Sequence, residues 1–476
     1  METFTSINEK IYGIVWGVPM LILLVGCGIY LTIQTRGVAF RRFGFILKNT
    51  VLRIFDKPDT SNEGTVSPFE ALSTALAATV GTGNIVGVSG AILLGGPGAI
   101  FWMWVAALLG MTTKMCEATL AVAYREVDEN GEVSGGPMYY ISKGLGLPTL
   151  GKIFAFFGTF ATLGIGNTVQ SNSIASTLQD NFGINKWITG FVVAAIAFIV
   201  IIGGIKRIGS FTSKMVPLMA AFYIFGALIV LFMHRANLGT AILSIFKGAF
   251  SSKAASGGIA GYTIMMALRN GVARGVFTNE AGLGSSPIAH AAAVTDHPAR
   301  QGLWGVFEVF LDTIVVATIT ALVILSTGIW HEHDNAASLV AYSFQEGFEA
   351  GRYIVTFGLV LFALSTILGW EYYGETCAKY LLGPTFGKMY RFAFIPLIVV
   401  GAVADLNAIW LIADNLNGLM AIPNLIGLIG LSGVVIKLTR DFFDDPERIR
   451  ENEEWRSMAP VKEKSKVKYK PGDVRH

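Results

Sequence analysis

Two apolar segments interrupted by glycine and polar residues, one in each half of the chain, constrain the fold most. The first interruption is Ala77–Asn84, which contains Gly81 and Gly83, and the second is Arg269–Gly284. Because unpaired backbone groups are costly in lipid, an unwound stretch persists at membrane depth only where protein or a cavity surrounds it. Interrupted helices at matching places in two halves predict the binding site of a secondary transporter.

The composition is that of a chain that crosses the membrane many times. Of 476 residues, 53% are hydrophobic and only 14% are charged, whereas a soluble domain carries about 25% charged residues. Ile11–Thr35 contains no charged residue over 25 positions. This run is too long for a signal-peptide core, and no small-residue cleavage site follows it, so we expect a retained transmembrane helix.

The apolar runs predict eleven transmembrane helices, at about 20 residues for each crossing. Ala71–Thr113 is uncharged for 43 residues and has a turn signal at Gly95–Gly98, so it holds two helices. Ala254–Leu268 and Ala281–Thr295 are each too short alone and make one discontinuous helix across the second interruption. The predicted fold is therefore an all-α membrane protein with one leading helix and two groups of five, each group beginning with a discontinuous helix.

Lysine and arginine in the loops predict the orientation. With the N-terminus outside, the inside segments hold 27 of these residues and the outside segments hold six. The two groups of five then have opposite topology, which is an inverted repeat in the cell (cytoplasmic) membrane. We expect a leading helix and loop at 1–66, repeats at 67–234 and 257–438, an external connection at 235–256 and a basic cytoplasmic tail at 439–476.

The first interruption offers groups for both an anion and a cation. Gly81 and Gly83 permit non-helical dihedral angles. The amides of Thr82–Ile85 then form the N-terminus of a half-helix, which favours a carboxylate. The freed carbonyls of Ala77 and Val80 suit a sodium ion.

Some of these residues also have a purely structural interpretation. Gly83, Gly87 and Gly90 partly fit a pattern of small residues that lets helices pack closely. Ser365 and Thr366 form a hydroxyl pair that suits sodium, but hydroxyls in buried helices usually bond to carbonyls of their own helix.

The second interruption carries charges at membrane depth, which indicate function by default. We expect Arg274 and Glu280 to pair and to gate the cytoplasmic side. The backbone carbonyls of Gly271–Gly275 are candidates for binding an ammonium group, and Phe277 is a candidate pocket wall.

Other polar residues in apolar runs leave two interpretations open. Asn167, Gln170 and Asn172 face the interior of the bundle, where they bind substrate or bridge helices. Trp370 caps a small pocket or is an interfacial anchor. Five carboxylates are ion or proton ligands or paired residues at helix ends: Glu117, Glu308, Asp312, Glu371 and Glu375.

Five long motifs resemble one known family, the alanine or glycine:cation symporters, which are the sodium:alanine symporters of bacteria and archaea. The motifs are Ser67–Leu72, Val80–Ile85, Gly95–Trp104, Ser134–Tyr140 and Arg274–Ser285. The resemblance runs from the first helix to about Arg440. It implies the five-plus-five inverted-repeat fold of amino acid–polyamine–organocation transporters and sodium-driven uptake of alanine, glycine or a similar small neutral amino acid.

The resemblance also implies roles for individual residues. Glu70 departs from the family pattern, which often has glutamine at this position. The implied substrate-binding residues are Thr79, Gly81, Thr82, Gly83, Asn84, Asn167, Gln170, Phe277 and Trp370, and the implied sodium ligands are Ala77, Val80, Phe362, Ser365 and Thr366.

The expected partners are a small neutral amino acid, a co-transported sodium ion and membrane lipid, without nucleic acid or catalysis. Proton coupling through Glu117 or Asp312 is the nearest alternative. A polytopic membrane enzyme that uses Glu280, Asp312 or the external His331 and His333 is a weaker one, because no nucleophile–base or metal-ligand spacing accompanies these residues. A channel fits less well, since the two interruptions differ in charge and sequence.

Overall fold

The computed structural model describes residues 2–54, 56, 62–127, 131–250, 264–404 and 407–445, and almost all of them are helical. In this part of the chain, eight helices are long and apolar enough to span a bilayer, and a bent pair makes a ninth. The prediction of an all-helical membrane protein is confirmed. The count of eleven also needs the shorter apolar helix α11 (Lys186–Ile201) and the second broken helix, so it stays a prediction.

The leading helix is α1 (Glu2–Val15) followed by α2 (Val18–Gln34), and together they supply one apolar span, Asn8–Gln34. Short helices α3 (Val38–Arg41) and α4 (Phe43–Thr50) follow at one end of the bundle. The first group of five then consists of the bent pair α5 (Pro68–Thr79) and α6 (Val86–Gly95), α7 (Gly98–Ala123), α9 (Pro148–Leu163) with α10 (Val169–Phe182), α11, and α12 (Gly204–Met233).

The second group begins at the broken helix α14 (Ile264–Asn279) and α15 (Pro287–His290). It continues with α16 (Pro298–Val309) and α17 (Thr318–Thr327), α19 (Gly351–Leu382), α20 (Pro384–Val403) and α21 (Asn407–Gly430). Most of Ala254–Leu268, the expected first half of the broken helix, lies outside the described residues.

Shorter elements lie around these two groups. They are α8 (Pro137–Gly144), α13 (Leu238–Phe250), α18 (Ala336–Gly347), α22 (Ser432–Asp444) and a two-stranded antiparallel ribbon of β1 (Glu126–Val127) and β2 (Val133–Ser134).

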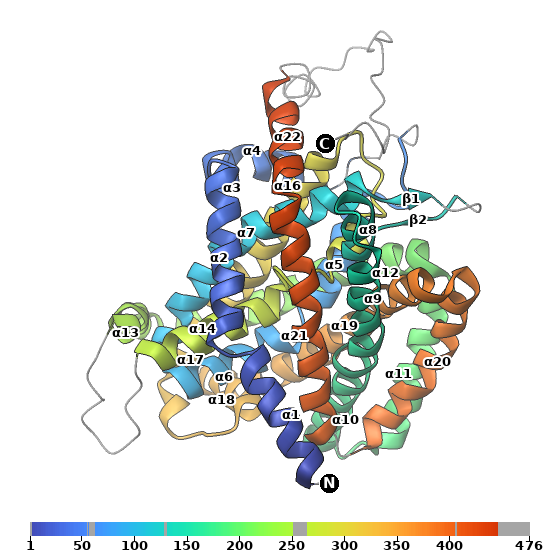
Figure 1. Cartoon of the computed structure of the whole chain (residues 1–476). Helices are drawn as coiled ribbons and strands as arrows, with labels where there is room; N and C mark the ends of the chain where they lie inside the picture. Colours follow the sequence, from blue (N-terminus) through green and yellow to red (C-terminus); the bar gives the residue numbers. More distant parts are fainter. Residues whose placement is uncertain are drawn as a thin grey trace.

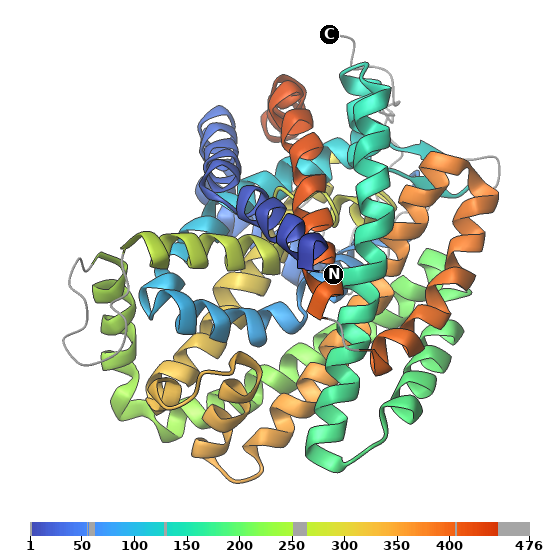
Figure 2. The same ribbon diagram turned by 60° about the horizontal axis from the view of Figure 1, so that its bottom comes forward.

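Helices distant in sequence pack together in the bundle. α11 packs on α20 at one edge, and α14 packs on α7 and α6 on the other side, as Figures 1 and 2 show. In Figure 1 the first helix begins at the bottom of the molecule and α22 ends at the top. The start of the first helix and the end of α22 thus lie at opposite ends of the bundle, as an odd number of crossings requires.

The sequence at the start of α5 explains both where this helix begins and what Glu70 does. The Ser67 side chain accepts a hydrogen bond from Glu70 N at 3.1 Å, and Glu70 Oε2 accepts one from Ser67 N at 2.8 Å. This capping box satisfies two amides that the first turn leaves unpaired. Glutamine can accept the same bond, so the family difference at this position is compatible with one shared structural role.

The second break lies further along the chain than the sequence predicted. α14 continues as a helix through Gly271–Gly275, so these carbonyls are not freed, and the prediction that they bind an ammonium group is wrong. Both glycines serve close packing against α7. A Cβ on Gly271 would lie 2.2 Å from Ala99 O, and one on Gly275 would lie 3.2 Å from Met103 Cγ.

The chain leaves the helix only after Asn279. Glu280, Gly282 and Gly284 all have positive φ, at 55°, 93° and 84°. Left-handed residues end a right-handed helix, and for glutamate this conformation is uncommon. The unwound segment therefore runs from Glu280 to the start of α15 at Pro287.

Arg125, just beyond the end of α7, ties together the segments next to the two broken helices. Its guanidinium donates hydrogen bonds to Glu63 O at 2.6 Å, Ala291 O at 3.1 Å and Ala293 O at 2.7 Å. The side chain is buried. Glu63 precedes α5 and the two alanines follow α15, so one cation holds the entrance of the first broken helix against the exit of the second.

We expect Arg125→Ala to destabilise the protein by about 2–4 kcal/mol, because three carbonyls lose a charged donor. Thermal unfolding in detergent measures the loss. Lys143→Ala is the matched control, since Lys143 forms a largely exposed ion pair with Glu126 at 2.8 Å that is worth at most about 1 kcal/mol. Equal losses in the two variants would show that Arg125 does not hold these segments together.

Candidate functional site

The first broken helix bends by 56° around Gly81. α5 ends when Gly81 becomes extended, and a single turn at Thr82–Asn84 leads into α6. Asn84 holds the break, because its Oδ1 accepts from Gly81 N at 3.0 Å and its Nδ2 donates to Asp312 O at 3.0 Å and Asp312 Oδ1 at 2.8 Å. The sequence prediction of a break at Gly81 is confirmed. Both ends of the Asn84 amide are thus committed to the protein.

The hydroxyl pair on α19 meets the end of α5. Ser365 Oγ and Thr366 Oγ1 each donate to Ala77 O at 3.1 Å, and they also bond to Phe362 O at 2.8 and 2.9 Å. Bonds to Phe362 are ordinary back-bonding within a helix, but bonds to Ala77 are not, since Ala77 lies on another helix. Four of the five expected sodium ligands therefore converge. Val80, the fifth, is buried directly after the end of α5, and its carbonyl accepts no hydrogen bond from either hydroxyl.

Glycine allows this approach of α5 to α19. A Cβ on Gly81 would lie 2.7 Å from Thr366 Oγ1, and a Cβ on Gly369 would lie 2.9 Å from Thr74 O. Larger residues at either position would separate the two helices.

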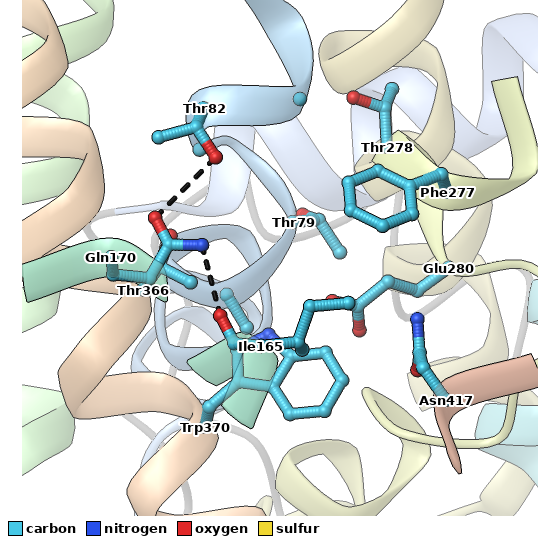
Figure 3. A pocket seen from close by; sticks show the side chains of 13 residues that line it. Thr79, Thr82, Ile165, Gln170, Phe277, Thr278, Glu280, Thr366, Trp370 and Asn417 are labelled. Carbon is cyan, nitrogen blue, oxygen red and sulfur yellow. Dashed lines mark hydrogen bonds between the residues drawn. The ribbon is translucent and has the colours of Figure 1, made fainter. Parts of the chain in front are cut away.

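A cavity lies between the two breaks, with an empty volume of about 320 Å³ that includes space open to solvent. Figure 3 shows its lining. Thr82 Oγ1 lies 3.4 Å from Gln170 Oε1, and Gln170 Nε2 donates to Ile165 O at 3.0 Å. Phe277 and Trp370 supply aromatic walls. The lining residues are Ala78, Thr79, Gly81, Thr82, Gly83, Ile165, Gln170, Phe277, Thr278, Glu280, Thr366, Trp370 and Asn417.

Most of the expected substrate residues line this cavity, and two do not. Asn84 is held by Gly81 and Asp312, as described above. Asn167 donates from Nδ2 to Phe394 O at 2.7 Å and joins the π-helical turn Gly164–Thr168 to α20. For Asn167 and for Asn172, which donates to two carbonyls at the end of α20, helix bridging is the role that the geometry fits.

The sequence analysis missed Ala78, Ile165, Thr278 and Asn417 as lining residues. Thr278 directly follows Phe277, and the prediction that Phe277 lines the pocket could have pointed to its neighbour as well. Asn417 is an amide in the last long apolar run of the chain, where an unpaired amide is costly. That cost could have indicated an inward-facing position.

The predicted ion pair between Arg274 and Glu280 is not formed. Among the described residues, Glu280 bonds instead to Ser285 Oγ, and the Arg274 guanidinium lies 5.8 Å from the centre of the Phe277 ring. The physical reason is that the helix ends between the two residues, and the left-handed turn at Glu280 aims its side chain into the cavity.

The unwound segment is held by buried groups from other helices. Glu117 Oε1 accepts from Gly282 N at 3.1 Å and from Asn424 Nδ2 at 2.6 Å, and Asn424 Nδ2 also donates to Gly282 O at 2.9 Å. Lys114 Nζ donates to Ser286 Oγ at 2.5 Å. α7 and α21 thus supply the partners that the unwound backbone lacks.

Lys114 is also the cation of a buried cluster beside this segment. Its Nζ lies 3.6 Å from Glu308 Oε1 and 3.9 Å from Glu117 Oε2. Glu308 Oε2 is 2.8 Å from His290 Nε2, and His290 Nδ1 is 2.8 Å from Gln301 Nε2. All five side chains are fully buried. The cluster fixes α15 against α7 and α16.

The other two expected carboxylates lie apart from the cavity. Glu375 forms a two-pronged ion pair with Arg391 at 2.6 and 2.8 Å, which joins α19 to α20. Glu371 is buried on the same helix, and neither of its oxygens has a hydrogen-bond partner among the described residues.

Comparison with known proteins shows which family the chain resembles in sequence. Residues 1–456 match the model of the sodium:alanine symporter family. The sodium/alanine symporter AgcS of Methanococcus maripaludis is 51% identical over 94% of this chain and 99% of its own length. GlnT of Bacillus subtilis, named a probable sodium/glutamine symporter, is 37% identical over 92% of this chain and 91% of its own.

A solved structure is similar in fold. The manganese transporter of Eremococcus coleocola superposes with a TM-score of 0.52 at 12% identity, covering 84% of this chain and 95% of its own. The fold is thus that of membrane transporters with inverted repeats, as predicted. Two broken helices around one cavity define a secondary transporter, a class in which the protein moves its ligand and does not transform it. The chain belongs to the sodium:alanine symporter family.

We expect Gly81→Ala to abolish sodium-dependent ligand binding, because the new methyl group would collide with Thr366 Oγ1. Gly87→Ala is the control, since a Cβ at buried Gly87, in α6, meets nothing within 4 Å. Binding of labelled alanine to purified protein is the measurement. Retention of binding in both variants would show that close contact between Gly81 and Thr366 is not needed.

Proposed function

We propose that this protein couples sodium entry to the uptake of alanine, glycine or a similar small neutral amino acid by alternating access. One observation carries the proposal: Thr366, which belongs to the cluster of sodium-suited oxygens, also lines the cavity between the two breaks, where Gly81 lies close to its hydroxyl. An ion and a substrate bound this close together influence each other directly. Linked sites typically couple by about 1–3 kcal/mol.

The amino acid would lie with its carboxylate at the first break. The turn at Thr82–Asn84 precedes α6, and amides at such a half-helix N-terminus favour negative charge. Gly81 and Gly83 let the ligand approach the backbone closely. Phe277, Ile165 and Trp370 would enclose the side chain, which favours a small side chain such as a methyl group.

The sodium ion would be held by oxygens alone. Carbonyls of Ala77, Val80 and Phe362 and the hydroxyls of Ser365 and Thr366 are the proposed ligands. The two hydroxyls now donate to Ala77 O and Phe362 O, and on binding they would turn their lone pairs to the ion. A cation there bridges α5 and α19 and so completes the adjoining substrate site.

The proposed membrane arrangement follows the loop charges. The N-terminus would lie outside, the tail from 439 would lie in the cytoplasm, and 67–234 and 257–438 would be inverted repeats. Arg274 in the last turns of α14 and Glu280 at the start of the unwound segment remain the proposed gating residues, acting by movement of this part of the chain and not by an ion pair.

Proteoliposomes test the function directly. Labelled L-alanine should accumulate with an inward sodium gradient and not with an inward potassium gradient of equal size. Accumulation driven instead by a pH gradient, with either cation, would favour proton coupling and overturn the sodium site. A folded protein that accumulates alanine under neither gradient would overturn the proposed substrate.

Ser365→Ala and Thr366→Ala should each raise the sodium concentration for half-maximal uptake, by about tenfold if one ligand oxygen is worth roughly 1–2 kcal/mol. Selectivity among amino acids should change little. Thr356→Ala on the same helix is the control, because its hydroxyl bonds to Arg352 O within the helix and to no other group in the described part of the chain. A loss of uptake that persists at saturating sodium, with no shift in sodium dependence, would contradict the assignment.

Replacing Phe277 or Trp370 with leucine should admit larger amino acids such as valine, because each change removes ring volume from the cavity wall. Competition by unlabelled amino acids against labelled alanine measures the selectivity. Phe357→Leu, an exposed phenylalanine on α19, is the control. Unchanged selectivity in folded variants would show that neither ring limits the size of the substrate.

A further inference from the structure

Glu280 is the one residue with an ionisable side chain among those that line the cavity. The side chain is 3% exposed, and one of its oxygens accepts from Ser285 Oγ. Among the described residues, the other oxygen, Oε1, has no hydrogen-bond partner, and Figure 3 shows the carboxyl group turned into the cavity. It therefore faces the cavity and is free to accept a hydrogen bond there.

Asn417, from α21, is a second polar side chain that lines the cavity. It is 1% exposed, and its Oδ1 has no hydrogen-bond partner among the described residues. A buried amide oxygen without a partner is costly. Figure 3 shows Asn417 and Glu280 next to each other, on the side of the cavity away from Thr82 and Gln170.

A cation in the cavity would satisfy both groups. A buried carboxylate is expensive unless it is paired. Lys114, the buried lysine nearby, has Glu117 and Glu308 as its ion-pair partners. Glu280 has no ion-pair partner among the described residues, so its carboxyl group is available to a cationic ligand.

We propose that Glu280 and Asn417 bind the ammonium group of the transported amino acid, and that they thereby select zwitterions over carboxylates without an amino group. The proposal rests on the proposed function and adds the recognition of the amino group to it. An ammonium group has three donors. Glu280 Oε1 and Asn417 Oδ1 accept two of them and leave the third for a backbone or hydroxyl oxygen of the cavity.

The local fold positions Glu280 for this task. Its left-handed φ of 55° ends α14 and turns the side chain inward, and Ser285 Oγ holds one of the two carboxylate oxygens. The carboxylate of the substrate would lie at the first break, so the two charges of the zwitterion would meet the two broken helices. Closure of the second break around the ammonium group would then depend on substrate.

The test compares alanine with propionate, which is alanine without its amino group. Both compete with labelled glycine for purified full-length protein in saturating sodium. In Glu280→Gln, alanine should bind roughly 10- to 100-fold more weakly, because a charge-assisted bond is lost. Propionate should bind equally well or better, since a carboxylate that repels it is gone.

Three outcomes are informative. Opposite responses of alanine and propionate would support the proposal. An equal loss for both ligands, or unchanged alanine binding, would overturn it. If the unmodified protein binds neither alanine nor glycine, the proposed function fails first, and that failure is separate from the result for Glu280.

Two further variants keep the test decisive if Glu280→Gln does not fold. Asn417→Ala should weaken alanine binding several-fold and leave propionate unchanged, whereas Glu280→Asp should keep most of the preference for alanine. Glu70→Gln is the control for loss of a carboxylate, because the capping box at the start of α5 accepts glutamine, and it should change neither ligand.

Discussion

The structure depends on one constraint: backbone groups released inside an apolar bundle need partners from the protein itself. The two breaks meet it differently. At the first break, one side-chain amide holds the backbone: Asn84 accepts a hydrogen bond from Gly81 N and donates to Asp312. At the second, Glu117 and Asn424 reach in from α7 and α21 to both polar groups of Gly282. The geometry of the cavity therefore depends on side chains that do not line it, namely Asn84, Glu117 and Asn424.

The sequence was most informative where a pattern has one physical meaning. Long uncharged runs predicted an all-helical membrane protein, and the polar residues around Gly81 predicted the first break. Glycine by itself is ambiguous, because it permits both unwinding and close packing. Gly271 and Gly275 were expected to unwind the helix, but they pack against Ala99 and Met103. Only the neighbouring helix distinguishes the two uses, and a single sequence does not show it.

Polar residues inside apolar runs show the same limit. Gln170 and Asn167 lie one turn apart on adjoining helical segments, yet the first faces the cavity and the second joins α20. Their spacing predicts that they face the interior, and the π-helical turn at Gly164–Thr168 then rotates the two side chains differently. Asn417 belongs to no motif, so its part in the lining became visible only when α21 was placed beside the second break. The prediction of an ion pair between Arg274 and Glu280 was wrong because α14 ends between the two residues.

The contact between α5 and α19 has a consequence for the direction of transport. Ala77 belongs to one helix and the hydroxyl pair to the other, and the glycines at 81 and 369 keep the two in contact. With sodium as proposed, the ion acts as a reversible cross-link whose occupancy follows the salt content of the compartment that the site faces. When the site faces the side with dilute sodium, the ion leaves and the contact between α5 and α19 weakens. When it faces the side with concentrated sodium, the ion binds and the contact strengthens. The difference in sodium concentration would then set the direction of net transport through this contact between α5 and α19. No signal other than the ion is needed.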